Sequence, residues 1–167
     1  MGYRFYLTSA YPIKYENYVN SASELYGVDE SLVYAIIRTE SKFDETATSH
    51  AGAIGLMQIL PSTFEWVKSK SQSETSEEDL KSPEINIDCG VHLISLLIDR
   101  YESLDTAICA YNAGIGTIDK WLKDPKTSTD GKQLIDVPYP ETKNYVKRVR
   151  DSQKMYKRLY FNKKFFC

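Results

Sequence analysis

The sequence predicts an all-α fold on three observations. Apolar residues recur at helical spacing in several segments, most clearly in 30–40, 83–101 and 140–159. The chain shows no sustained alternation of apolar and polar residues, which is the pattern typical of strands. Proline, glycine, serine or aspartate stands at the ends of the periodic segments, where helices usually begin and end. We therefore expect a mainly helical domain with at most one small β-hairpin, placed in the glycine-rich segment 41–60.

The first two predicted helices lead to a carboxyl group in an unusual position. The chain from Pro12 to Tyr26 is predicted as a helix that starts at its proline and stops at Gly27. Asp29 is expected to cap the second helix. The apolar positions of this second helix are Leu32, Val33, Ile36 and Ile37. One further helical step along the same stripe reaches Glu40, which should therefore face the core.

The middle of the chain contains two further helix starts. Pro61 should open a short helix that carries Trp66, a residue that we expect in the core. The polar segment 69–79 should be a surface loop in which Ser76 begins a capped turn. Pro83 is a typical helix start, and the helix that follows is predicted to be the central buried one.

Three more helices are predicted in the last third of the chain. Asp105 is expected to cap a helix that stops at Gly114. Gly116 should break the chain again before a short helix around Trp121, which we expect in the core. Pro140 should start the final helix, because a residue that precedes proline avoids the helical conformation.

Length and composition suggest one soluble domain. The chain has 167 residues, enough for a single well-buried core. Its net charge of −2 gives no general reason to expect nucleic-acid binding. No transmembrane run is visible, and the opening residues are too short for the apolar part of a signal peptide. We interpret residues 1–11 as an N-terminal extension or the stub of a removed anchor, and residues 12–167 as a single domain.

The three cysteines predict neither a metal site nor a disulfide framework. Their number is odd, and the spacing of Cys89, Cys109 and Cys167 fits no metal-binding pattern. Cys89 and Cys109 fall on apolar helix faces, so we expect buried free thiols, with a bridge between them as the alternative. Cys167 is expected to be free. We expect no metal and no cofactor.

Glu40 has the properties expected of a general acid. Its place on a core-facing stripe should remove water from its charge, and a helix C-terminus disfavours a negative charge. Both effects raise the pKa of a carboxyl group, which can then donate a proton near neutral pH. The plainer alternative is that Glu40 pairs with Arg38 or Lys42, and on helix position alone that is the more common outcome.

Three motifs follow one another along the chain. The first comprises Glu40, Ser41, Phe43, Ala47, Ser49, Gly52, Ala53, Gly55, Leu56, Met57, Gln58 and Pro61; the second comprises Ala110, Tyr111, Asn112, Ala113, Gly114, Gly116 and Trp121; the third comprises Val137, Pro138, Glu141, Thr142, Tyr145, Val146 and Val149. A weaker match joins them through Asn86, Gly90 and Leu93. In this order they resemble the lytic transglycosylase domain of the soluble-lytic-transglycosylase type. The resemblance covers roughly 18–156, and His92 stands where the family often has tyrosine.

The resemblance implies a goose-type lysozyme-like fold with a substrate groove. It also implies that Glu40 is the single catalytic acid and base. The positions that it assigns to the groove are Ser49, Met57, Gln58, Leu60, Tyr111, Asn112, Glu141 and Tyr145. Leu60 stands where some relatives carry methionine, so only the apolar character of that contact is retained.

Several of these residues have a second interpretation. Gln58 could satisfy backbone groups of its own turn, and Asn112 could simply end a helix. Glu141 lies in a first helical turn, where a carboxylate is favourable in any case. Tyr111 could hold either Glu40 or the substrate through its hydroxyl.

The resemblance implies a peptidoglycan lytic transglycosylase. Such an enzyme cleaves the β-1,4 bond between N-acetylmuramic acid and N-acetylglucosamine and leaves a 1,6-anhydro-muramoyl product. Most glycosidases use two carboxyl groups, whereas the catalytic motif here contains one. The expected partner is a peptidoglycan glycan strand, with no nucleic acid and with a membrane only if an anchor was removed. We expect a monomer located in the cell envelope outside the cytoplasm.

Three alternatives remain open at this point. The first is a hydrolytic muramidase on the same fold. The second is a catalytically silent module that binds the cell wall, which an intact Glu40 argues against. The third is a helical interaction domain, which gives no reason for three motifs in order.

Overall fold

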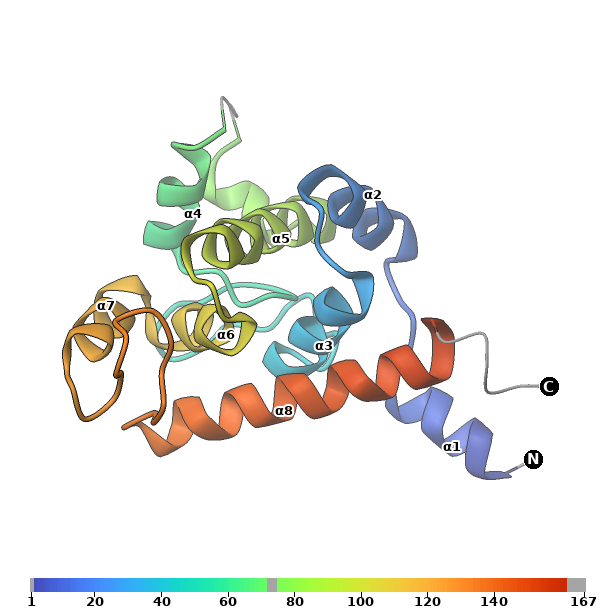
Figure 1. Ribbon diagram of the computed structural model, residues 1–167. Helices are drawn as coiled ribbons and strands as arrows, with labels where there is room; N and C mark the ends of the chain where they lie inside the picture. The colour runs from blue at the N-terminus through green and yellow to red at the C-terminus, as the bar shows by residue number, and fades with distance from the viewer. Residues whose placement is uncertain (1, 72–74, 162–167) are drawn as a thin grey trace.

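The computed structural model describes residues 2–71 and 75–161, and in this part of the chain the protein is helical (Figure 1). Its elements in order are α1 (Gly2–Ala10), α2 (Glu16–Tyr26), α3 (Glu30–Glu40), α4 (Pro61–Lys68), the 3-10 helix η1 (Glu77–Lys81), α5 (Pro83–Arg100), α6 (Leu104–Ala113), α7 (Ile115–Lys123), α8 (Pro140–Tyr156) and the π-helical turn η2 (Lys157–Phe161). The prediction of a mainly helical fold is confirmed. In the described residues the glycine-rich segment forms the isolated bridges Thr48–Ile54 and Ile54–Ile59, with no named strand.

Helix α3 lies at the centre of the core. Its residues 31–37 are all buried. It packs on α8, which runs along one side of the molecule under α3 and α6, while α5 packs on α2 and α6 at the opposite side (Figure 1). The apolar side chains of α3 are buried by the helices around it, and this burial fixes the position of the helix. Glu40, the last residue of α3, is thereby held next to the core.

Most of the predicted helix starts are confirmed. The carboxylate of Asp29 accepts a hydrogen bond from the Ser31 backbone nitrogen at 2.9 Å, as an N-cap should. Helices α4, α5 and α8 each have their proline in the first turn. Ser76 and Asp79 form a reciprocal capping box at the start of η1.

Three predicted boundaries are wrong. Helix α2 starts at Glu16 and not at Pro12, because Tyr15 has a left-handed backbone (φ 57°) that interrupts the helical run. Ser103, and not Asp105, is the N-cap of α6, because its hydroxyl accepts a hydrogen bond from the Thr106 backbone nitrogen. Gly116 lies inside α7 and does not break the chain.

A buried asparagine on α5 holds the glycine-rich loop 41–60. Asn86 is 1% exposed, and its side-chain oxygen accepts a hydrogen bond from the Met57 nitrogen at 2.8 Å. Its side-chain nitrogen donates to the carbonyl oxygens of Ile54 at 2.9 Å and Leu80 at 3.0 Å. A Cβ atom at Gly55 would lie only 2.5 Å from that nitrogen, and Gly55 has a φ of 75°. Glycine is therefore required where the loop approaches Asn86.

A second close approach joins the loop to α5. The side chain of Met57 is fully buried, and a Cβ atom at Gly90 would lie 2.4 Å from its sulfur. Because Gly90 has no side chain, the side chain of Met57 can occupy the space next to α5. The loop is held against the core by packing as well as by hydrogen bonds.

The termini and cysteines complete the comparison with the sequence. Helix α1 lies within the segment 1–11 that we predicted as an extension, and the division of the chain at residue 12 stays a prediction.

Of the described helices, none combines the length and the apolar character needed to span a membrane. Cys89 and Cys109 are buried free thiols, so the alternative of a bridge between them is wrong, and burial raises the pKa of each to about 12. Cys167 lies outside the described residues.

Replacement of Asn86 by alanine should destabilise the fold strongly. Asn86→Ala leaves backbone groups of Met57, Ile54 and Leu80 without their hydrogen-bond partner, at a cost of about 1–3 kcal/mol for each buried group that stays unpaired. We expect a loss of about 3 kcal/mol in the free energy of unfolding, measured by urea denaturation. The control is Asn144→Ala on the exposed face of α8, which should change it by about 0.5 kcal/mol or less. Equal stability of the two variants would contradict the role of Asn86.

Candidate active site

Glu40 is the last residue of α3 and its side chain is partly buried. The next residue, Ser41, ends the helix, and its hydroxyl lies 2.8 Å from the carbonyl oxygen of Leu56, to which it donates a hydrogen bond. The backbone nitrogen of Phe43 donates to the same hydroxyl at 3.1 Å. The end of α3 is thereby tied to the glycine-rich loop, and the prediction that the helical stripe ends in an inward carboxyl group is confirmed.

Tyr145 on α8 holds the carboxyl group. Its hydroxyl donates a hydrogen bond to Glu40 Oε1 at 2.6 Å, and its side chain is 2% exposed. The two residues are far apart in sequence and meet because α3 packs on α8. A short hydrogen bond from a buried tyrosine fixes the direction in which the carboxyl group points.

The surroundings of Glu40 raise its pKa from the usual 4.5 to about 7. Burial is the main cause, because it disfavours the charged form. The hydrogen bond from Tyr145 and the positive charge of Arg148 act in the opposite direction and lower the pKa. The result is a carboxyl group that can both give and accept a proton near neutral pH.

The alternative in which Glu40 merely pairs with a neighbouring cation is wrong. Among the described residues no ion pair joins it to Arg38 or Lys42. The Nε of Arg38 instead donates to the Ala10 carbonyl oxygen at 2.8 Å, and its guanidinium lies 4.0 Å from the centre of the Tyr11 ring.

The acidic residues nearest to Glu40 in sequence form hydrogen bonds with other residues. Asp44 is exposed and accepts hydrogen bonds from the backbone and hydroxyl of Thr46. Glu45 is also exposed and accepts a hydrogen bond from the Tyr15 hydroxyl at 2.8 Å. Neither is a second carboxyl group of the site.

Tyr111 supports the loop and does not hydrogen-bond to Glu40. Its hydroxyl donates to the carbonyl oxygen of Met57 at 2.8 Å. Burial, and after it the negative charge of Glu40, raise the pKa of Tyr111 well above its usual value. Of the two roles left open for this tyrosine, holding Glu40 belongs to Tyr145.

An apolar cavity of about 500 Å³ lies next to Tyr111. It is formed between α4, α5 and α6, and its wall includes Leu60, Trp66, Leu93, Tyr111, Asn112 and Ile115. The Asn112 side-chain oxygen accepts a hydrogen bond from the Thr142 hydroxyl at 2.8 Å, which joins α6 to α8. The cavity therefore brings together three of the predicted groove residues, Leu60, Tyr111 and Asn112, from two motifs.

Trp66 is a cavity residue that the sequence did not identify. We expected it in the core, but it is only partly buried and lines the apolar cavity. Its place on α4, the short helix that Pro61 begins at the end of the first motif, is the signal that could have located it.

The other predicted groove residues lie apart from the apolar cavity. The Gln58 side chain donates to the carbonyl oxygens of Ala47 and Gly55 at 3.1 and 2.9 Å, so it braces its own turn. Ser49 accepts a hydrogen bond from the Ala53 nitrogen at 3.0 Å. Met57 is buried and meets the site through its backbone carbonyl. Glu141 is exposed in the first turn of α8, one turn before Tyr145.

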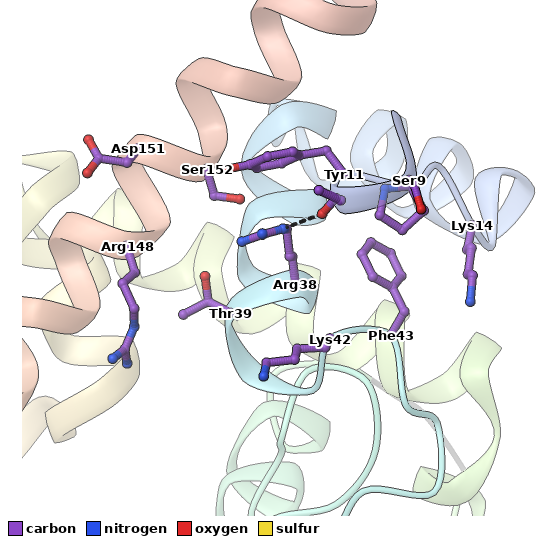
Figure 2. Close-up of a pocket in the computed structure, with 12 residues that line it drawn as sticks. Ser9, Tyr11, Lys14, Arg38, Thr39, Lys42, Phe43, Arg148, Asp151 and Ser152 are labelled. Carbon is purple, nitrogen blue, oxygen red and sulfur yellow. Dashed lines mark hydrogen bonds between the residues drawn. The ribbon is translucent and has the colours of Figure 1, made fainter. Parts of the chain in front are cut away.

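A second cavity, of about 970 Å³, lies between the end of α1, the end of α3 and the middle of α8 (Figure 2). Its wall includes Lys14, Arg38, Thr39, Lys42, Arg148 and Ser152. We call it the cationic cavity. The sequence did not predict it, because its side chains come from segments that are distant in the chain.

The described residues offer no metal centre. In 2–71 and 75–161, no three histidine, cysteine, aspartate or glutamate side chains lie close enough together to hold an ion.

Comparisons with known protein families and with curated relatives agree with one another. Residues 17–134, more than half of the chain, match the family described as the transglycosylase SLT domain. The membrane-bound lytic murein transglycosylase C of Cronobacter sakazakii is 33% identical over 173 residues, which cover 87% of this chain and 47% of that protein. The protein of the same name from Shigella sonnei is 34% identical over 168 residues with the same coverage. The chain thus spans about half the length of the curated relatives it matches.

Solved structures agree with the sequence comparison. The 70 kDa soluble lytic transglycosylase of Escherichia coli matches with a TM-score of 0.80 and 26% identity, over 94% of this chain and 26% of that one. An inactive mutant of the lytic transglycosylase Slt of Pseudomonas aeruginosa matches with a TM-score of 0.77 and 28% identity, over 89% of this chain and 24% of that one.

Removal of the Tyr145 hydroxyl should raise the pKa of Glu40 further. Tyr145→Phe takes away the hydrogen bond that lowers this pKa and leaves the burial that raises it. The pKa should move above about 7, which can be followed by ¹³C NMR titration of the glutamate carboxyl groups. Tyr111→Phe is the contrast, because that hydroxyl donates to Met57, and it should move the pKa less. A fall in the pKa of Glu40 in Tyr145→Phe would contradict this assignment.

Titration of Glu40 should also make the fold less stable above about pH 7 than at acidic pH. Between pH 4.5 and about 7 the folded chain keeps a proton on Glu40 that the unfolded chain has lost, so the free energy of unfolding falls as pH rises through this window. Glu40→Gln removes this loss and should be more stable than the parent by about 2 kcal/mol at about pH 8, with no such gain at about pH 4.

Urea denaturation at the two pH values measures the difference. Glu45→Gln, at an exposed carboxylate, is the control and should follow the parent at both. The same pH dependence in Glu40→Gln and in the parent would show that Glu40 titrates normally in the folded chain.

Proposed function

The chain belongs to the transglycosylase SLT domain family, and from this premise we propose that it is a peptidoglycan lytic transglycosylase. It would cleave the β-1,4 bond between N-acetylmuramic acid and N-acetylglucosamine and form a 1,6-anhydro-muramoyl end. The observation that carries the proposal is the partly buried carboxyl group of Glu40, which has a pKa of about 7 and a tyrosine that orients it. One such group can serve as acid and then as base within one reaction.

The first step uses the protonated form of Glu40. Its proton passes to the glycosidic oxygen while the bond from that oxygen to C1 of the muramoyl residue breaks. The N-acetyl group of the same sugar can stabilise the positive charge that develops at C1, so a second protein carboxylate is not needed. Asp44 and Glu45 are exposed and hydrogen-bonded to Thr46 and Tyr15, so neither is available as a second acid, which agrees with a mechanism that needs only Glu40.

The second step uses the carboxylate that the first step leaves. Glu40 takes the proton of the C6 hydroxyl, and the oxygen of that hydroxyl bonds to C1. The anhydro ring closes, Glu40 regains its proton, and no water is consumed. A pKa of about 7 suits both directions of transfer, because neither form of the carboxyl group is strongly favoured near neutral pH. The hydrogen bond from Tyr145 would hold Glu40 in position during both transfers.

The apolar cavity suits sugar rings on one side of Glu40. Trp66 and Tyr111 provide flat apolar surface, and Asn112 provides an amide. We infer that Leu60, Tyr111 and Asn112 contact the glycan strand there. Gln58, Ser49 and Met57 would act by holding the shape of the loop, and Glu141 at the exposed start of α8 would meet the strand only at its edge.

The names of the relatives support a proposal for the substrate and the location. The curated relatives are named as membrane-bound enzymes of murein, and we infer that this chain acts on peptidoglycan in the cell envelope. We propose that it acts as a monomer, because Glu40, Tyr145 and the apolar cavity all come from the same chain.

Product analysis tests the proposal. Purified protein is incubated with peptidoglycan sacculi, and the soluble products are identified by mass spectrometry. We expect 1,6-anhydro-muramoyl ends, a rate about 10²–10⁴-fold lower in Glu40→Gln, and a fall in kcat/KM as pH rises above about 7, where Glu40 loses its proton. Glu45→Gln is the matched control and should keep the parent rate.

Other results would identify the alternatives. Reducing muramic ends without the anhydro sugar would indicate a hydrolytic muramidase. Binding to sacculi without soluble products would indicate a silent wall-binding module. Full activity in Glu40→Gln would remove Glu40 from the mechanism.

A further inference from the structure

Thr142 belongs to the third motif, but the proposed reaction gives it no role. It is 2% exposed and lies in the first turn of α8. Its hydroxyl donates a hydrogen bond to the side-chain oxygen of Asn112 at 2.8 Å. Asn112 is part of the wall of the apolar cavity, whereas Thr142 lies behind that wall. Thr142 can therefore act on a sugar in the cavity only through Asn112.

The hydrogen bond from Thr142 decides which way the amide of Asn112 faces. An amide has an oxygen that accepts and a nitrogen that donates, so its two orientations differ in the partners they suit. In the first turn of a helix the carbonyl group four residues earlier lies outside the helix, and in the described part of the chain the Thr142 hydroxyl bonds only to Asn112. The opposite orientation of the amide would leave the buried hydroxyl proton without an acceptor, which is unfavourable.

The nitrogen of the same amide is left for a partner from outside the chain. Asn112 is partly buried near the end of α6, and none of the described residues accepts a hydrogen bond from its side-chain nitrogen. This nitrogen is also not enclosed in the core, in contrast to the unpaired hydroxyls of Tyr34 and Ser152. With its oxygen bound to Thr142, Asn112 presents its N–H groups to the apolar cavity.

The same face of α8 orients the catalytic carboxyl group. Tyr145 follows Thr142 by one helical turn, and its hydroxyl donates to Glu40 at 2.6 Å. Both residues are 2% exposed, and α8 packs on α3 and on α6. Two buried hydroxyls of one helix thus fix the directions of the carboxyl group and of the amide.

We propose that Thr142 is a positioning residue that fixes the amide of Asn112, so that its N–H groups bind an acceptor oxygen of the sugar in the apolar cavity. The proposal rests on the proposed function, which places the glycan strand in this cavity. Sugar rings offer such acceptors in their hydroxyl, ring and acetamido oxygens. A donor that already faces its acceptor needs no reorganisation when the sugar binds.

Two substitutions remove the arrangement from opposite sides. Thr142→Val removes the hydroxyl, so nothing selects one direction of the amide. Asn112→Asp keeps an acceptor for the Thr142 hydroxyl, and with it the link between α6 and α8, but it replaces the N–H donors with an oxygen. Thr142→Ser keeps the hydroxyl and is the conservative variant. The matched control is Thr106→Val, because Thr106 on α6 is also 2% exposed and has no hydrogen bond to Asn112.

The first measurement is the Kd for soluble glycan strands, which an amidase releases from sacculi. It is made by calorimetry in a Glu40→Gln background, so that the strands are not cleaved. We expect the Kd to rise about threefold in Thr142→Val, as for one weakened neutral hydrogen bond, and about tenfold in Asn112→Asp, where an acceptor meets an acceptor. Thr142→Ser and Thr106→Val should bind as the parent does. In an Asn112→Ala background Thr142→Val should change the Kd no further.

The second measurement is the kinetics on the same strands with Glu40 intact. Thr142→Val should raise KM about threefold and leave kcat unchanged, which is the result of losing binding that ground state and transition state share. A purely structural role of Thr142 gives a different pattern. It predicts a lower free energy of unfolding in urea for Thr142→Val, and parent affinity for Asn112→Asp, whose link to α8 is intact.

Three results would overturn the proposal: an unchanged Kd in Asn112→Asp, an unchanged Kd in Thr142→Val, or a Thr142→Ser variant that binds as weakly as Thr142→Val. If Thr142→Val does not fold, Asn112→Asp and Thr142→Ser decide the question. An absence of anhydro products from the parent would instead count against the proposed function, because the Kd series does not depend on cleavage.

Discussion

The hydroxyl of Tyr145 donates a hydrogen bond to Glu40 across the interface of α3 and α8, and the other features of the site support this contact. A carboxyl group at the inner end of a helix loses hydration, and without a polar partner it would be both uncharged and free to turn. The tyrosine gives it a fixed direction and partly offsets the effect of burial on its pKa. Because the tyrosine comes from α8, the site exists only when the last long helix has packed on the third.

The glycine-rich loop 41–60, which follows Glu40, is held in place by three of the helices around it. Asn86 holds the loop from α5, Ser41 holds it from the end of α3, and Tyr111 holds it from α6. All of these hydrogen bonds are made to backbone atoms of the loop, so they depend on its backbone conformation more than on its side chains. The need for glycine at Gly55 has the same origin, because a side chain there would occupy the space of Asn86.

The sequence predicted the helices and the place of Glu40 because both depend on local periodicity. The apolar stripe of α3 continues by one helical step to the carboxyl group, and that step could be counted without a structure. The start of α2 was wrong because the rule for a first-turn proline does not foresee the left-handed backbone of Tyr15. The roles of Tyr111 and Tyr145 could not be separated, because each hydroxyl finds its acceptor only through the packing of distant helices. The cationic cavity was missed for the same reason.

The two buried thiols have a consequence for the chemical reactivity of the folded protein. Cys89 and Cys109 are unpaired, and burial raises the pKa of each to about 12, so almost none of either is present as the reactive thiolate at neutral pH. The packing around them contains no disulfide, so the folded core does not depend on an oxidant to hold it together. Once the chain is folded, burial protects both sulfur atoms from oxidation and from thiol–disulfide exchange.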